Sequence, residues 1–88
     1  MDGQPKPIIF TNHSRDRLLY RGTTESDVVR AIREGNREPA QRSLWQYRLN
    51  LEFQKEWAGN WYAVQQVAPV VAEEPNRFVV ITVYTLYF

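Results

Sequence analysis

The sequence contains no cysteine and only one histidine, His13. The absence of cysteine excludes disulfide bonds and cysteine-based metal sites. A single histidine with no second histidine or cysteine beside it also argues against a zinc site. We therefore expect a functional site without metal and without cofactor.

Long apolar runs are also missing. The first ten residues, MDGQPKPIIF, lack the basic start and apolar run of a signal peptide. No run elsewhere approaches the roughly 20 residues that span a bilayer. The sequence predicts a cytoplasmic protein with no membrane partner.

The chain has no large excess of charge of either sign, because its formal net charge is +1. Residues 1–48 carry nine Lys or Arg against six Asp or Glu, whereas residues 49–88 carry two against four. The mild basic bias of the first half favours contact with phosphate groups. Ordinary variation in composition explains the same asymmetry.

The length of 88 residues corresponds to one domain. Its twelve aromatic side chains each bury a large area and so strengthen a small core. Residues 1–7 include two prolines and a glycine without periodicity, which predicts a flexible lead-in. Residues 8–88 are expected to form a single domain.

Local signals predict a short strand at residues 8–10 and then a first helix. Thr11 or Asn12 can cap this helix, since each offers a side-chain oxygen to free backbone N–H groups. Leu18 and Leu19 supply its apolar anchor, and Gly22 ends it.

A second helix is predicted between Thr24 and Gly35. Thr24 and Asp27 resemble a capping box, and the glycine lies where a C-terminal cap belongs. The buried stripe of this helix is expected to contain four residues, namely Val28, Val29, Ala31 and Ile32.

After Pro39 the apolar residues alternate with polar ones, which predicts strands. The segment LWQYRLNLEF forms the first, and a turn at Gly59-Asn60 leads to a second, which Pro69 should end or move to an edge. A turn at EEPN precedes the third, RFVVITVYTLYF. The predicted fold is α+β: a short N-terminal strand, two packed helices, then a curved antiparallel sheet of three strands.

Polar residues of the first predicted helix recur at spacings of three and four, so His13, Arg17, Tyr20 and Arg21 share one side. Histidine can move a proton near neutral pH, and the arginine fork holds two phosphate oxygens. The spacing therefore fits a phosphate site. A solvated helix face, with Asp16 paired to an arginine, is the alternative.

The predicted sheet adds further polar groups on the face away from the helices. Arg48 and Gln46 lie on the first long strand, and Thr82 and Tyr84 lie on the last, opposite its apolar residues. These side chains suit a ligand surface. Packing of Thr82 and Tyr84 against cross-strand neighbours is the alternative.

The segment FTNHSRDRLLYRGTTESDVVRAIREGN and the later VVITVY resemble the small bacterial family of domains of unknown function numbered 4258. The resemblance covers residues 8–84, with Ser14 and Thr23 departing from the usual alanine and apolar residue. Its matched residues are Thr11, His13, Arg17, Leu18, Arg21, Gly22, Val28, Ala31, Ile32, Thr82 and Tyr84.

The resemblance implies a fold similar to RelE-like and barnase-like ribonuclease toxins, which act without metal and are often held inactive by an antitoxin. It implies that His13 is an acid or base and that Arg17 holds the phosphate. We predict three catalytic residues, His13, Arg17 and Tyr84. The predicted substrate-binding residues are Arg21, Arg48 and Thr82, and the predicted partners are RNA and an antitoxin-like protein.

A non-catalytic binding module is the other hypothesis. Such a protein would use the sheet face or the aromatic C-terminal segment YTLYF. An apolar strand at an edge can pair with another chain, which allows a homodimer or an antitoxin-like partner.

Overall fold

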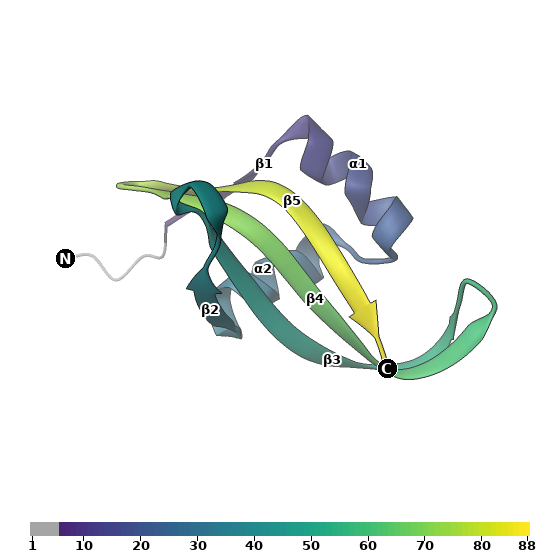
Figure 1. Ribbon diagram of the computed structural model, residues 1–88. Coiled ribbons are helices and arrows are strands. Elements are labelled where there is room, and N and C mark those ends of the chain that lie inside the picture. Colours follow the sequence, from purple (N-terminus) through teal and green to yellow (C-terminus); the bar gives the residue numbers. More distant parts are fainter. Residues whose placement is uncertain (1–5) are drawn as a thin grey trace.

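The computed structural model describes residues 6–88, which form a five-stranded mixed sheet and two α-helices (Figure 1). The elements are β1 (Ile8–Phe10), α1 (Asn12–Arg21), α2 (Glu25–Glu34), β2 (Asn36–Pro39), a 3-10 turn (Gln41–Ser43), β3 (Trp45–Trp57), β4 (Asn60–Glu74) and β5 (Arg77–Tyr87).

The helices begin and end where their capping residues predict. The hydroxyl of Thr11 accepts the backbone N–H of Ser14 at 3.0 Å, and Thr24 accepts that of Asp27 at 3.2 Å. Gly22 follows α1 in the left-handed conformation, with φ of 73°. These predictions are confirmed because capping depends on residues that are neighbours in sequence.

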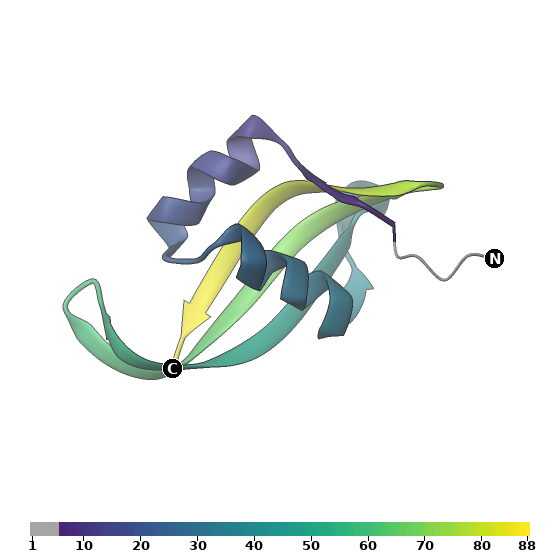
Figure 2. The ribbon, with the colours of Figure 1, turned by 180° about the vertical axis from the view of Figure 1, so that it is seen from behind.

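The sheet has the order β1-β5-β4-β3-β2, with β1 parallel to β5 and the other pairs antiparallel. Both helices cover one face of it, seen in front in Figure 2. The prediction of three strands in the sheet is wrong. The short β1 joins as an edge strand, and β2, whose four residues are all exposed, pairs with the start of β3.

Pro69 neither ends β4 nor lies at an edge, contrary to the prediction. It lies in the middle of a central strand, opposite Val83 of β5. The β3–β4 pairing passes from Gln46↔Val70 to Leu49↔Val67 without a partner for Pro69, since proline has no N–H to donate. The sheet tolerates the missing bond.

The turns lie close to their predicted places. The β3–β4 hairpin turns at Ala58 and Gly59, one residue earlier than predicted, and both have positive φ. The β4–β5 turn lies at Pro75-Asn76 within EEPN.

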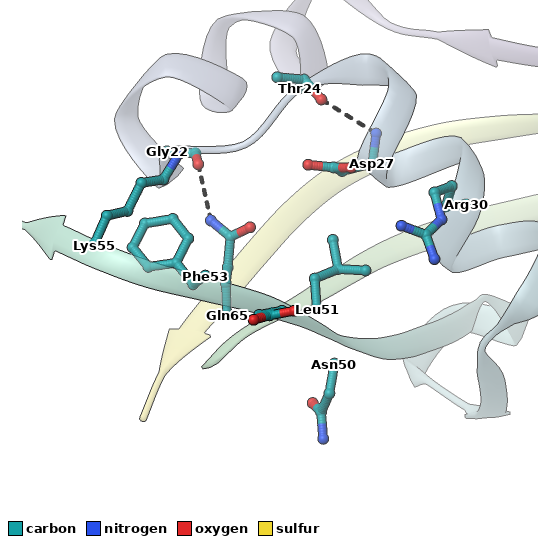
Figure 3. A pocket seen from close by; sticks show the side chains of 10 residues that line it. Gly22, Thr24, Asp27, Arg30, Asn50, Leu51, Phe53, Lys55 and Gln65 are labelled. Atoms are coloured by element: carbon teal, nitrogen blue, oxygen red, sulfur yellow. Dashed lines mark hydrogen bonds between the residues drawn. The ribbon is translucent and has the colours of Figure 1, made fainter. Parts of the chain in front are cut away.

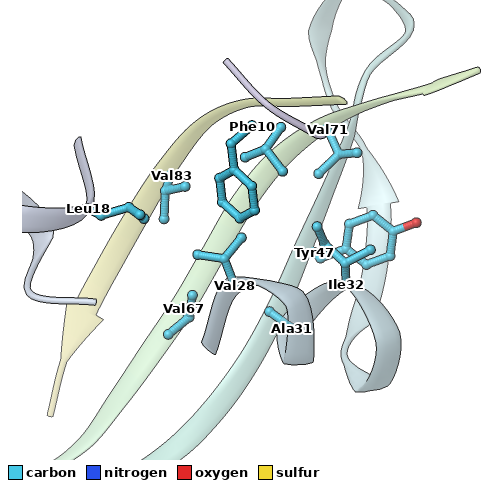
Figure 4. Packing of buried hydrophobic residues seen from close by; sticks show 10 residues of the cluster. Phe10, Leu18, Val28, Ala31, Ile32, Tyr47, Val67, Val71 and Val83 are labelled. Atoms are coloured by element: carbon cyan, nitrogen blue, oxygen red, sulfur yellow. The ribbon is translucent and has the colours of Figure 1, made fainter. Parts of the chain in front are cut away.

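The hydrophobic core lies between the helices and the sheet (Figure 4). Val28, Ala31 and Ile32 of α2 are buried there, as predicted, while Val29 is half-buried. Leu18 is the apolar anchor of α1, but Leu19 is 86 % exposed and is no part of the core. The remaining buried members come from the strands and are Phe10, Tyr47, Val67, Val71, Val80 and Val83.

The N-terminal segment can be followed from Lys6 onward; residues 1–5 of the predicted lead-in lie outside the described residues. Lys6 forms an ion pair of 2.7 Å with Glu73, and the carbonyl oxygen of Pro7 accepts the N–H of Phe78 at 2.9 Å. Neither helix of the described chain combines the length and apolar character needed to cross a membrane.

Candidate functional site

Helix α1 is attached to β5 by hydrogen bonds at both of its ends. At the start, the Thr11 hydroxyl donates to the carbonyl oxygen of Val80 at 3.1 Å. At the end, the hydroxyls of Thr85 and Tyr87 both donate to the carbonyl oxygen of Arg21, the first at 2.8 Å. The helix is therefore held alongside the last strand, and its residues are fixed relative to those of β5.

This attachment brings predicted site residues from opposite ends of the chain together. The Nε2 atom of His13 lies 3.4 Å from the Oγ1 atom of Thr82. The guanidinium carbon of Arg21 lies 5.4 Å from the centroid of the Tyr84 ring. We call the set His13, Arg17, Arg21, Thr82 and Tyr84 the α1–β5 strip.

The arginines of the strip carry charge that no carboxylate of residues 6–88 neutralises. Within residues 6–88, neither Arg17 nor Arg21 forms an ion pair, and Asp16 pairs with no arginine. Arg15, two residues before Arg17 and therefore on another side of the helix, pairs instead with Glu25 at 2.9 Å. Ordinary ion pairing on a solvated helix face therefore describes Arg15, but not the arginines of the strip.

The side chains of the strip differ in their surroundings. His13 is exposed, and Tyr84 is 45 % exposed, so both rings are open to solvent. The guanidinium carbon of Arg17 lies 5.6 Å from the centroid of the Tyr20 ring. The buried Nε atom of Arg21 has no hydrogen-bond partner in the described chain. This N–H group can therefore still donate a hydrogen bond.

Arg48 lies on the same uncovered face of the sheet, but apart from the strip. Tyr84 pairs with Ala68 of β4, and the β3–β4 register puts Arg48 on the far side of Ala68. Its guanidinium donates to Glu38 at 2.7 Å, to Gln66 at 3.0 Å and to Gln46 at 3.2 Å. Arg48 is therefore already paired, in contrast to Arg17 and Arg21.

No pattern in the sequence singles out Glu38, the residue that neutralises Arg48. It comes from β2, a strand that the periodicity missed because the segment NREP is polar throughout. Glu38 can neutralise Arg48 only because β2 pairs with β3, and this pairing brings the two side chains together.

Apolar side chains continue beyond Tyr84 on the same face. Leu86 and Phe88 follow it at alternate positions and are 42 % and 60 % exposed. Trp61, near the tip of the β3–β4 hairpin, is also exposed. Alternation in the segment YTLYF is the sequence signal for this surface.

Two of the hollows on the described surface are relevant to the site. One, of about 820 Å³, lies on the outer side of α1 and is lined by His13, Arg15, Asp16, Arg17, Leu19 and Tyr20. The other, of about 430 Å³, lies between α2 and β3. Within residues 6–88, no group of three or more His, Asp or Glu is arranged to hold a metal ion.

The chain matches no known protein-family model, no curated protein and no solved structure.

Proposed function

We propose that this protein is a metal-independent endoribonuclease of the toxin type, with its RNA substrate lying along the α1–β5 strip. The observation that carries the proposal is the meeting of α1 and β5, which combines an exposed histidine, two arginines without an ion pair in residues 6–88, and an exposed tyrosine. The resemblance of residues 8–84 to a family related to RelE-like toxins supports the same function.

Arg17 and Arg21 supply the affinity for phosphate in this proposal. A guanidinium group presents planar donors that match phosphate oxygens and remains charged at all physiological pH values. Because no carboxylate competes for them in residues 6–88, binding a phosphate requires no internal ion pair to be broken.

Tyr84 supplies a surface for a nucleobase. Exposed aromatic rings stack on the unpaired bases of single-stranded RNA. The Arg21 guanidinium already covers part of this ring, so a phosphate held by Arg21 would lie close to a base held by Tyr84.

His13 is the group suited to proton transfer. In the proposed reaction, a base removes the proton of the ribose 2′-hydroxyl, and that oxygen attacks the adjacent phosphorus. The bond from phosphorus to the 5′-oxygen breaks, and an acid protonates this oxygen, which leaves a 2′,3′-cyclic phosphate and a 5′-hydroxyl. His13 serves as one of the two, the Tyr84 hydroxyl is the candidate for the other, and the arginines stabilise the charge on phosphorus.

The proposal is tested by RNA cleavage in the presence of a chelator. The parent chain should cleave a mixed-sequence RNA to products with cyclic phosphate ends, and His13→Ala should lower the rate by about 100-fold or more. Since His13 is exposed, the variant should fold normally, which circular dichroism checks. Equal cleavage by parent and variant, or no cleavage by either, contradicts the proposal.

A non-catalytic binding module is the second candidate, favoured by the exposed Leu86 and Phe88. A row of apolar side chains beside Tyr84 suits a protein partner, either an antitoxin-like protein or a second copy of this chain. The double substitution Leu86→Ser and Phe88→Ser should then abolish association measured by light scattering, while His13→Ala should leave association unchanged.

A further inference from the structure

The outer edge of β3 is only partly paired. On this side, β2 pairs with Trp45–Arg48 and ends there, whereas β4 pairs with β3 on the other side as far as Trp57. From residue 49 onward, β3 therefore has no neighbouring strand on its outer edge within residues 6–88.

The position of Gly35 beside β3 shows which backbone groups of this strand point to its outer edge. A Cβ atom placed on Gly35 would lie 2.5 Å from the carbonyl oxygen of Arg48, so this carbonyl faces the outer edge. Successive residues of a strand direct their N–H and C=O groups to alternate sides. The backbone groups of Asn50 and Glu52 must then also face outward, where none of the described strands receives them.

The cleft of about 430 Å³ lies along this same edge (Figure 3). Its wall on α2 carries Asp27 and Arg30, and its wall on β3 carries Leu51, Phe53 and Lys55. Figure 3 shows Leu51 and Phe53 on the side of β3 that faces α2, while Asn50 points to the other side. The free edge thus has an adjoining groove with an apolar floor.

The charges that line the groove are balanced. Asp27 and Glu52 contribute two carboxylates, and Arg30 and Lys55 contribute two cations. Arg30 is also paired with Glu34 at 3.3 Å. A polyphosphate would meet two carboxylates here, whereas a peptide backbone is neutral and its side chains can match both signs.

We propose that the β3 edge from Leu49 to Phe53 binds an extended peptide segment of a partner protein as an added strand. The free N–H and C=O groups of Asn50 and Glu52 supply the backbone hydrogen bonds. An apolar side chain of the peptide packs on Leu51 and Phe53. A basic side chain pairs with Asp27, which forms no ion pair in the described chain.

The length of the added strand is limited by an irregularity in β3. The β3–β4 register shifts between Glu52 and Lys55, and Gln54 has a φ of 49°. A regular ladder therefore ends beside Phe53, and about five residues of the peptide pair with β3. This groove and the α1–β5 strip both adjoin the end of α1, but they have no residue in common. The inference is therefore independent of the ribonuclease proposal.

The test is selection of a random heptapeptide library displayed on phage, with the purified chain as bait. Glu52→Pro removes the outward N–H but leaves the bonds to β4, which come from the alternate residues. Glu52→Ala is the matched control, because it removes the same side chain and keeps the N–H. Peptides that carry both an apolar and a basic residue should be enriched on the parent and on Glu52→Ala, with affinity at least about tenfold lower for Glu52→Pro.

A second measurement does not depend on the folding of any variant. A selected peptide added to the isotope-labelled parent chain should slow hydrogen exchange at the amides of Asn50 and Glu52. Absence of enriched peptides, equal binding by Glu52→Pro in its folded form, or protection of other amides instead would overturn the proposal. A dimer in solution that Glu52→Pro dissociates would assign the edge to a second copy and also overturn it, as would protection of these amides by an RNA oligonucleotide.

Discussion

The guanidinium of Arg21 lies over the ring of Tyr84, with 5.4 Å between the guanidinium carbon and the ring centroid. The two residues come from the last turn of α1 and from the uncovered side of β5. Because the carbonyl oxygen of the same arginine accepts the hydroxyls of Thr85 and Tyr87, this arrangement is built into the docking of the helix. The positive charge of Arg21 and the aromatic ring of Tyr84 therefore lie side by side on the surface.

Tyr84→Ala should weaken binding of a single-stranded RNA oligonucleotide by about tenfold, since stacking of one base contributes about 1–3 kcal/mol. Tyr84→Phe should retain most of the affinity because it keeps the ring. Fluorescence anisotropy with both variants measures the difference. An unchanged dissociation constant for Tyr84→Ala would exclude a base at this ring.

Arg17→Gln and Arg21→Gln should each reduce the salt dependence of RNA binding. Loss of one phosphate contact on a single strand lowers the slope of log K against log salt by about 0.7. Arg15→Gln is the control on the same helix, since Arg15 is paired with Glu25 and should change the slope least. Equal effects of all three substitutions would indicate a general charge effect instead of a localised one.

Glu38→Gln should strengthen RNA binding. The carboxylate of Glu38 neutralises Arg48 on the face that also carries Tyr84, so its removal makes another cation available. The expected gain in affinity at low salt is about two- to fivefold and should vanish at high salt. Glu34→Gln frees Arg30, which lies on α2, and should change binding less. A loss of affinity in Glu38→Gln would contradict this role.

Glu73→Gln should reduce the dependence of stability on pH in the acidic range. Lys6 and Arg37 donate hydrogen bonds to this carboxylate and lower its pKa below the ordinary value of 4.5. A lowered pKa in the folded state contributes stability above the unfolded pKa, which is lost as the pH falls through the folded pKa. Urea unfolding at pH 7 and at pH 3 should differ less for the variant than for the parent. The effect should stay below about 1 kcal/mol, because the pair is partly exposed.

Gly35→Ala should lower the free energy of unfolding by about 1–3 kcal/mol, as overpacking does. The added Cβ atom would meet the carbonyl oxygens of Ala31 and Arg48, each at 2.5 Å. Gly59→Ala is the comparison, because its Cβ atom meets nothing within 4 Å and only its φ of 88° is unfavourable. Urea denaturation of the two variants separates close contact from backbone strain; a larger loss at Gly59 would contradict this assignment.

The parts of this fold that were predicted correctly depend on short-range signals. Thr11, Gly22 and Thr24 mark helix ends through contacts with residues three or four positions away. The five-stranded sheet was missed because β1 pairs with β5 across the length of the chain. The prediction for Pro69 is wrong because propensity disfavours proline in a central strand, whereas the packing of β4 between two neighbours outweighs one absent hydrogen bond.

For the candidate site, too, the sequence predicts the arrangement within the helix but not the contacts between the helix and the sheet. The spacing of His13, Arg17 and Arg21 on one helix face is a local property, and it held in the helix that formed. Which strand residues meet them depends on how α1 docks, and no periodicity contains that information. The pairing of Arg48 with Glu38 was missed for the same reason.

The parallel pairing of β1 with β5 has a consequence for the order of events during synthesis. The segment that follows β1 carries the histidine and arginines of the strip, but β5, on which both β1 and α1 dock, is synthesised after the other described elements. Until β5 has left the ribosome, the nascent chain holds the cationic half of the strip without its tyrosine and threonine. The two halves of the strip therefore come together only after β5 has been synthesised.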